Sequence, residues 1–155
     1  MKLDELFEKT VKMLNDRQVE FAVAGGFAAS LYRNEVRTTK DIDFLIASKN
    51  NPLKIATEII EQLGLAAEIS RKADLQGGPL FAIKRKTTEP WIAVGRAKDD
   101  PNGGGVDFLL PAIPWVPDAV ENAKHNLIDF GFGKVPTMIL DDVVIAKLVA
   151  FMDSS

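Results

Sequence analysis

Two aspartates stand one residue apart inside an apolar run, in the segment Asp41-Ile42-Asp43-Phe44. If this run is a β-strand, Asp41 and Asp43 point to one face and Ile42 and Phe44 to the other, because successive side chains of a strand alternate. Two carboxylates on one face repel each other unless a cation lies between them. Asp41 and Asp43 therefore indicate a divalent-metal site for phosphoryl or nucleotidyl transfer. The alternative is a loop position for Asp41 and an exposed strand end for Asp43.

A glycine pair, Gly25-Gly26, separates a short apolar run from a stretch of small and apolar residues. Glycines between a strand and a helix let backbone N–H groups approach an anion closely, and the helix N-terminus adds a favourable dipole. The triphosphate of a nucleotide fits such a cradle. The pair could also serve only a tight turn and close helix packing. Its combination with Asp41 and Asp43 favours the nucleotide interpretation.

A third carboxylate, Asp107, also lies in an apolar strand-like run. If its strand neighbours that of Asp43, the three aspartates can hold two metal ions roughly 3.5–4 Å apart, which would align a nucleophile and a leaving pyrophosphate. Asp107 would then be the general base, or the ligand that polarises the attacking hydroxyl. The alternatives are an ordinary strand-end aspartate and a calcium turn in segment 99–102, which lacks the spacing of an EF-hand.

The elements that must position these residues follow from hydrophobic periodicity and from turn residues. Amphipathic or capped helices are predicted over 3–16, 53–63, 117–124 and 140–152, and a short buried helix over 27–32. Strands are predicted over 19–24, 41–47, 66–70, 80–86, 91–94 and 106–110, with a β-hairpin within 127–138. This order predicts an α/β (α+β) domain whose sheet carries the carboxylates.

The composition limits the kind of metal site. The chain contains no cysteine and a single histidine, which excludes thiolate sites and multi-histidine sites. Oxygen ligands remain, and they favour Mg²⁺ or Mn²⁺. A net charge of −3 provides no general attraction for nucleic acid.

The size and apolar content also limit the protein class. With 155 residues, 46% of them hydrophobic and 26% charged, the chain has the properties of one globular domain. No apolar run approaches the roughly 20 residues that a membrane span requires. Residues 1–8 are acidic and lack a signal-peptide core, so a cytoplasmic protein without membrane contact is expected.

The ordered set of motifs resembles the nucleotidyltransferase fold of the DNA polymerase β superfamily. The matching segments are Ala24-Gly25-Gly26, Arg37-Thr38-Thr39-Lys40-Asp41-Ile42-Asp43-Phe44, Val106-Asp107-Phe108-Leu109 and the helix around Lys147. The chain is particularly similar to minimal nucleotidyltransferases and to abortive-infection toxin nucleotidyltransferases. The resemblance spans most of the sequence. It implies a single nucleotidyltransferase-like domain over 1–155, with a mixed, mostly antiparallel sheet flanked by helices.

The resemblance also implies roles for individual residues. Mg²⁺ (or Mn²⁺) would bind Asp41 and Asp43, with Asp107 as the third carboxylate. A nucleoside triphosphate (NTP) would lie against the glycine pair. Further phosphate contacts would come from Ser30, in place of a serine that many members carry after the first glycine, and from Arg37 and Lys147. Without the resemblance, Arg37 would be read as a surface residue and Lys147 as a lysine whose stem covers apolar surface.

The predicted reaction is transfer of a nucleoside monophosphate from an NTP to an acceptor, with release of pyrophosphate. The acceptor could be a protein, a tRNA end or a small molecule, and the chain could be the enzymatic part of a toxin–antitoxin pair. The alternative is a catalytically weak or inactive nucleotide-binding module that acts as a sensor or as the antitoxin of another protein. The three aspartates favour the enzyme, whereas the missing serine and the short segment after Lys147 favour the module.

Overall fold

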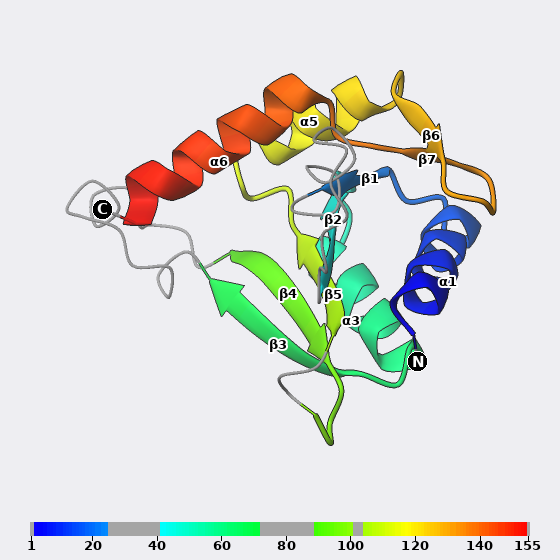
Figure 1. The fold of residues 1–155 in the computed structure, drawn as a ribbon. Helices are drawn as coiled ribbons and strands as arrows, with labels where there is room; N and C mark the ends of the chain where they lie inside the picture. Colours follow the sequence, from blue (N-terminus) through cyan, green and yellow to red (C-terminus); the bar gives the residue numbers. More distant parts are fainter. Residues whose placement is uncertain (1, 25–40, 72–88, 101–103, 155) are drawn as a thin grey trace.

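The computed structural model describes residues 2–24, 41–71, 89–100 and 104–154. These residues form a five-stranded sheet in the order β1-β2-β5-β4-β3, with helices on both of its faces (Figure 1). The strands are β1 (Phe21–Ala24), β2 (Asp41–Ile46), β3 (Ala66–Arg71), β4 (Pro90–Arg96) and β5 (Gly105–Leu109). β2 and β5 are parallel and every other neighbouring pair is antiparallel. The predicted mixed, mostly antiparallel sheet is confirmed.

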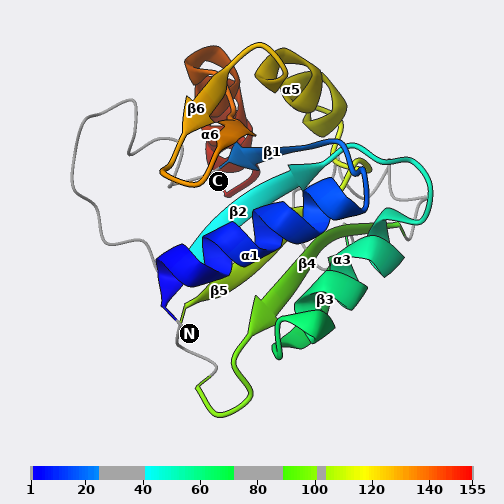
Figure 2. The same cartoon turned by 90° about the vertical axis from the view of Figure 1, so that its right-hand side faces the viewer.

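One face of the sheet is covered by α1 (Leu3–Asp16) and α3 (Pro52–Gln62), which lie side by side in Figure 2. The helix α1 buries Leu6, Phe7, Val11 and Leu14 because this spacing places them on one side. The helix α3 begins with proline at its first position, where the missing N–H costs nothing. Both helices are therefore defined by local sequence, and the sheet supplies the surface that they bury.

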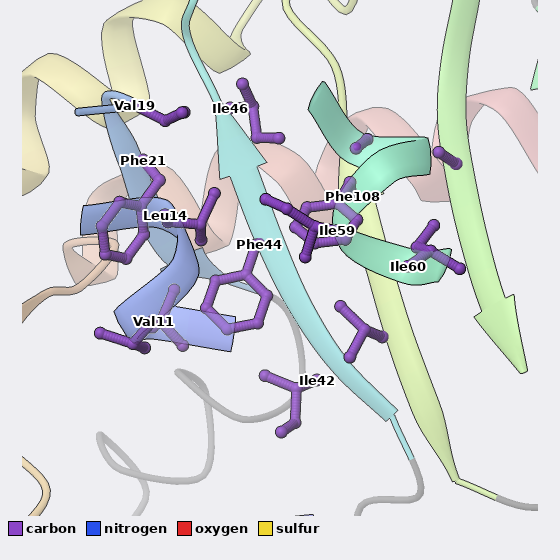
Figure 3. Packing of buried hydrophobic residues seen from close by; sticks show 14 of the residues in the cluster. Val11, Leu14, Val19, Phe21, Ile42, Phe44, Ile46, Ile59, Ile60 and Phe108 are labelled. Atoms are coloured by element: carbon purple, nitrogen blue, oxygen red, sulfur yellow. The ribbon is translucent and has the colours of Figure 1, made fainter. Parts of the chain in front are cut away.

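Figure 3 shows the apolar cluster beneath these helices. It lies on the face of β2 opposite Asp41 and Asp43, because Ile42 and Phe44 alternate with them along the strand. Ile42, Phe44 and Phe108 are fully buried in it. The ring of Phe44 stacks on that of Phe108, with centroids 5.8 Å apart, so β2 and β5 are joined by side chains as well as by backbone hydrogen bonds. This packing fixes which face of each strand is left for polar residues.

A second apolar cluster lies on the other face, under α5 (Val116–Ala123) and the beginning of α6 (Leu140–Ser154). It contains Ala22 and Ala24 of β1 and Leu45 of β2. A hairpin, β6 (Leu127–Asp129) and β7 (Lys134–Pro136), leads into α6. The chain after the hairpin is attached to β1, since the Met138 N–H donates to the Val23 carbonyl at 2.9 Å.

The predicted elements within the described residues are present. Most bounds agree to within one or two residues, the usual uncertainty of helix and strand ends. β4 is longer than predicted and reaches Arg96, because its pairing with β5 continues as far as Gly105. The predicted helix over 27–32 and strand over 80–86 lie outside the described residues.

In the described part of the chain, the helices are too short or too polar to cross a lipid bilayer. The cytoplasmic location stays a prediction.

Candidate active site

Three carboxylates lie on one face of the sheet, where β2 and β5 begin. In the parallel pair, Asp43 lies directly opposite Asp107, and Asp41 lies opposite Gly105. The alternating residues Ile42 and Val106 are fully buried on the other face. A shared site requires that Asp43 and Asp107 lie on neighbouring strands. The structure meets this condition.

A fourth charged residue, Arg96, reaches these carboxylates from β4. Arg96 lies opposite Gly105 in the β4–β5 pair, so Arg96, Gly105 and Asp41 form one row across three strands. Its guanidinium donates from Nη1 to Asp107 Oδ1 at 2.8 Å and lies 3.2 Å from Asp41 Oδ2 through Nη2. Nη1 also donates to the Gly95 carbonyl at 2.9 Å. One arginine thus bridges two of the three aspartates.

Glycine at position 105 makes this bridge possible. A Cβ atom built there would overlap the Gly95 carbonyl oxygen and would lie 2.7 Å from Nη1 of Arg96. Any side chain would therefore push the arginine away from the row. The side chain of Arg96 crosses β5 through the space that Gly105 leaves, which is how it reaches Asp41 on the next strand.

The electrostatics of the site are unusual at Asp43. Burial, repulsion by Asp107, a hydrogen bond with the Asp107 carboxyl group and repulsion by Asp41 raise the pKa of Asp43 from an ordinary value near 3.8 to about 7. Arg96 opposes this rise. Burial acts to lower the pKa of Arg96, but its hydrogen bond and attraction to Asp107 outweigh that effect, so the pKa is raised and the guanidinium stays charged.

The donor atoms present fit a hard divalent cation. All are carboxylate oxygens, the ligands that Mg²⁺ and Mn²⁺ prefer. Oδ1 of Asp41 is buried and has no hydrogen-bond partner among the described residues, so it is an orphaned acceptor. Nevertheless, within residues 2–24, 41–71, 89–100 and 104–154 no three acidic, histidine or cysteine side chains converge on one point as a ready ligand set. Arg96 holds two of the carboxylates instead.

Comparison with known proteins identifies the family. The family model described as "Nucleotidyl transferase AbiEii toxin, Type IV TA system" matches residues 14–155. The chain belongs to this family. The predicted resemblance to nucleotidyltransferases, including abortive-infection toxins, is confirmed, and the AbiEii family is one of transferases. Among curated proteins, no match to the sequence is found.

One solved structure agrees with the AbiEii assignment at the level of the fold. The antibiotic-resistance factor ANT(2'')-Ia has a TM-score of 0.55 and 14% sequence identity, over 94% of this chain and 70% of that chain. A putative nucleotidyltransferase from H. pylori has a TM-score of 0.46 and 18% identity, over 94% and 56% of the two chains. A tRNA-processing enzyme has a TM-score of 0.49 and 10% identity, over 94% and 34%. The chain thus spans less than two thirds of the length of the H. pylori protein and of the tRNA-processing enzyme.

The structure of this AbiEii family member brings together only part of the predicted site. Asp41, Asp43 and Asp107 share one face of the sheet. Lys147 lies in α6, and its side chain is outside the described part of the structure. The predicted nucleotide contacts Gly25, Gly26, Ser30 and Arg37 also lie outside the described residues.

The sequence patterns do not predict Arg96 as a site residue. The signal available was a basic residue two positions beyond the apolar run of 91–94, in register with a strand that carries an aspartate. That register is not readable from one sequence, because strand order and pairing depend on the whole sheet. Without it, Arg96 could not be distinguished from an ordinary surface arginine.

Proposed function

We propose that this chain transfers a nucleoside monophosphate from an NTP to an acceptor and releases pyrophosphate, with Mg²⁺ or Mn²⁺ as cofactor. The observation that supports it best is the direct pairing of Asp43 with Asp107, with Asp41 on the same face, in a chain of the AbiEii family. A nucleotidyltransferase needs carboxylates on adjoining strands to hold the divalent cations that neutralise its negatively charged substrate and product.

Each aspartate has a role in this proposal. Asp41 and Asp43 are the metal ligands, and Asp107 is the third. A divalent cation at these carboxylates supplies charge neutralisation and orientation of the triphosphate. The acceptor forms a bond to the α-phosphorus while the bond to pyrophosphate breaks, and Asp107 accepts the proton of the acceptor or polarises the group that carries it.

The nucleotide contacts of the proposal are those that the sequence predicts. Backbone N–H groups of Gly25 and Gly26 bind the triphosphate, because glycine lets the chain approach an anion closely. Ser30, Arg37 and Lys147 supply further phosphate contacts. The acceptor is a protein, a tRNA end or a small molecule. The toxin–antitoxin description of the family supports a partner protein of the same system.

The first test is thermal unfolding with each of the four NTPs in the presence of Mg²⁺ or Mn²⁺. A ligand that binds only the folded state stabilises it by about 2.7 kcal/mol at a concentration of 100 times its Kd. We expect the wild-type melting temperature to rise by about 5 °C or more with at least one pair of nucleotide and metal. Asp43→Asn should abolish the rise.

The matched control is Asp16→Asn, the same chemical change at an exposed position on α1, across the sheet from the site. It should respond to nucleotide and metal as the wild type does. An absence of response in the wild type with every nucleotide and both metals would overturn the proposal.

The second test separates catalysis from binding. Wild-type protein and Asp43→Asn are incubated with labelled nucleotides and a cell extract, and the labelled component is identified. Label that depends on Asp43 supports the transferase. Nucleotide binding without any transfer would instead support the nucleotide-binding module, a sensor or an antitoxin.

A further inference from the structure

Among the described residues, one arginine forms ion pairs with two of the three aspartates of the candidate active site. Arg96 is the residue that forms ion pairs with this group in the described part of the chain, with contacts to Asp107 at 2.8 Å and to Asp41 at 3.2 Å. Its side chain is 23% exposed, and those of Asp41 and Asp107 are 35% and 20% exposed. Partly buried charges of this kind interact more strongly than those of an exposed surface pair.

The bridge is part of the architecture of the sheet rather than a chance contact of a long side chain. The guanidinium has three acceptors, one on each of three strands: Asp41 on β2, Asp107 on β5 and the Gly95 carbonyl on β4. The path to Asp41 requires glycine at position 105. An arginine with several fixed partners is far more ordered than one with a single surface partner.

Arg96 occupies one oxygen of each of two carboxylates that are proposed as metal ligands. Asp41 Oδ2 and Asp107 Oδ1 face the guanidinium, while Asp41 Oδ1 has no hydrogen-bond partner among the described residues. The carboxylates therefore point to a fixed organic cation and do not converge as a metal ligand set. A divalent cation that binds these carboxylates must compete with the guanidinium, because both are positively charged and both use the same two side chains.

We propose that Arg96 is a resident counter-cation, which neutralises Asp41 and Asp107 in the metal-free protein and gives way when a divalent cation binds. This inference rests on the proposed function for the divalent cation. Two consequences follow from competition. Arg96 stabilises the metal-free fold, and it weakens metal binding, because binding must break its ion pairs and because its positive charge repels the ion.

A role for Arg96 as a rigid support of the metal ligands would have the opposite effect. If the guanidinium held Asp41 and Asp107 in the geometry that the metal requires, its removal would weaken metal binding. Competition and support therefore predict opposite signs for the same measurement. The sign can be measured on the metal-bound protein without any assay of catalysis.

The experiment uses the full chain and Mn²⁺ alone as the probe. Arg96→Met removes the charge and keeps an apolar stem, whereas Arg96→Lys keeps the charge but lacks the planar fork that bridges two carboxylates. The control is Arg17→Met, the same change at an arginine whose partner is Glu58 at 3.7 Å. Mn²⁺ affinity is measured by isothermal titration calorimetry, and melting temperatures are measured with chelator and with Mn²⁺.

Competition predicts that Arg96→Met binds Mn²⁺ at least about ten-fold more tightly than the wild type. Its melting temperature should be lower with chelator, and its rise with Mn²⁺ larger than that of the wild type. Arg96→Lys should lie between the two proteins. Arg17→Met should bind Mn²⁺ with wild-type affinity.

The outcomes separate this inference from the proposed function. If the wild type binds Mn²⁺ and both Arg96 variants bind it equally or more weakly, the counter-cation role is wrong and the proposed function stands. If neither the wild type nor the variants bind Mn²⁺ alone, the counter-cation role is wrong, and the unfolding test with NTP and metal decides the proposed function separately. If Arg96→Met does not fold with chelator, the affinity of Arg96→Lys decides between competition and support.

Discussion

Asp43 has two carboxylate neighbours, and its pKa is raised from 3.8 to about 7. Burial is the largest cause, and the adjacent Asp107 carboxylate is the second. Asp107 lies next to Asp43 because β2 and β5 are parallel and in register, so the strand pairing itself creates the repulsion. Protonation of Asp43 or a bound cation relieves this repulsion. The stability of the folded protein should therefore depend on both pH and metal binding.

Stability should depend on the protonation of Asp43. The unfolded chain releases this proton near pH 3.8, and the folded protein keeps it up to about pH 7. Since the native state binds more protons in this interval, the contribution of Asp43 is present below about pH 4 and is lost as the pH rises through 7. Without metal, Asp43→Asn should therefore stabilise the protein at pH 8, by roughly 1 to 3 kcal/mol.

The measurement is urea unfolding of the wild type and of Asp43→Asn between pH 4 and 8, in the presence of a chelator. The difference between the two free energies of unfolding should grow as the pH rises, while contributions of groups far from the site cancel. Asp16→Asn should show no such growing difference. A constant difference for Asp43→Asn across this range would contradict the raised pKa.

The strand β2 illustrates how one element joins the site to the core. Its alternation places Asp41 and Asp43 on the face away from α1 and α3, and Ile42 and Phe44 in the apolar cluster under these helices. Asp is unfavourable in strands, so the strand depends on the burial of its apolar residues. Burial of Ile42 and Phe44 on one face thus fixes the position of the carboxylates on the other.

Ile42→Ala should be strongly destabilising, because Ile42 is fully buried. It lies between Asp41 and Asp43 in the sequence. Truncation of a buried isoleucine costs about 2 to 5 kcal/mol through lost burial and a residual cavity. The control is Ile69→Ala on the edge strand β3, where the side chain is 37% exposed and the cost should be about 1 kcal/mol or less. Chemical denaturation of both variants measures the two costs, and similar values would contradict the role given to Ile42.

At the scale of the whole molecule, one sheet separates two apolar clusters. Ile59 of α3 belongs to the cluster on one face, and Val120 of α5 belongs to the cluster on the other. β1 and β2 contribute residues to both clusters, for example Phe44 to the first and Leu45 to the second. Because the same strands serve both faces, neither cluster can be lost without disturbing the other.

We therefore expect one cooperative unfolding transition for the whole chain, as for a single domain over 1–155. Ile59→Ala and Val120→Ala should each lower the melting temperature of that one transition, since their costs of roughly 1 to 5 kcal/mol fall on a shared structure. Differential scanning calorimetry of both variants is the measurement. Two separable transitions, each moved by only one of the substitutions, would show that the clusters unfold independently.

Much of the fold was predictable because its signals are local. The helical spacing of Leu6, Val11 and Leu14, the proline before α3 and the alternation in β2 all act within a few residues of the chain. The candidate metal ligands were predictable for the same reason, since an aspartate in an apolar strand is costly and requires an explanation. The sequence did not establish that the strands of Asp107 and Asp43 are neighbours, although the predicted metal site required it.

The sequence by itself determined the helices, most of the strands, the three aspartates on polar faces of strands and the kind of cation that they suit. Only the tertiary structure decided that β5 lies between β2 and β4, and hence that Arg96 bridges Asp41 and Asp107 over Gly105. The physical reason is that alternation and helical periodicity are properties of neighbouring residues. Strand order and register depend instead on how both faces of the sheet are buried together, which brings residues 41, 96 and 105 into one row.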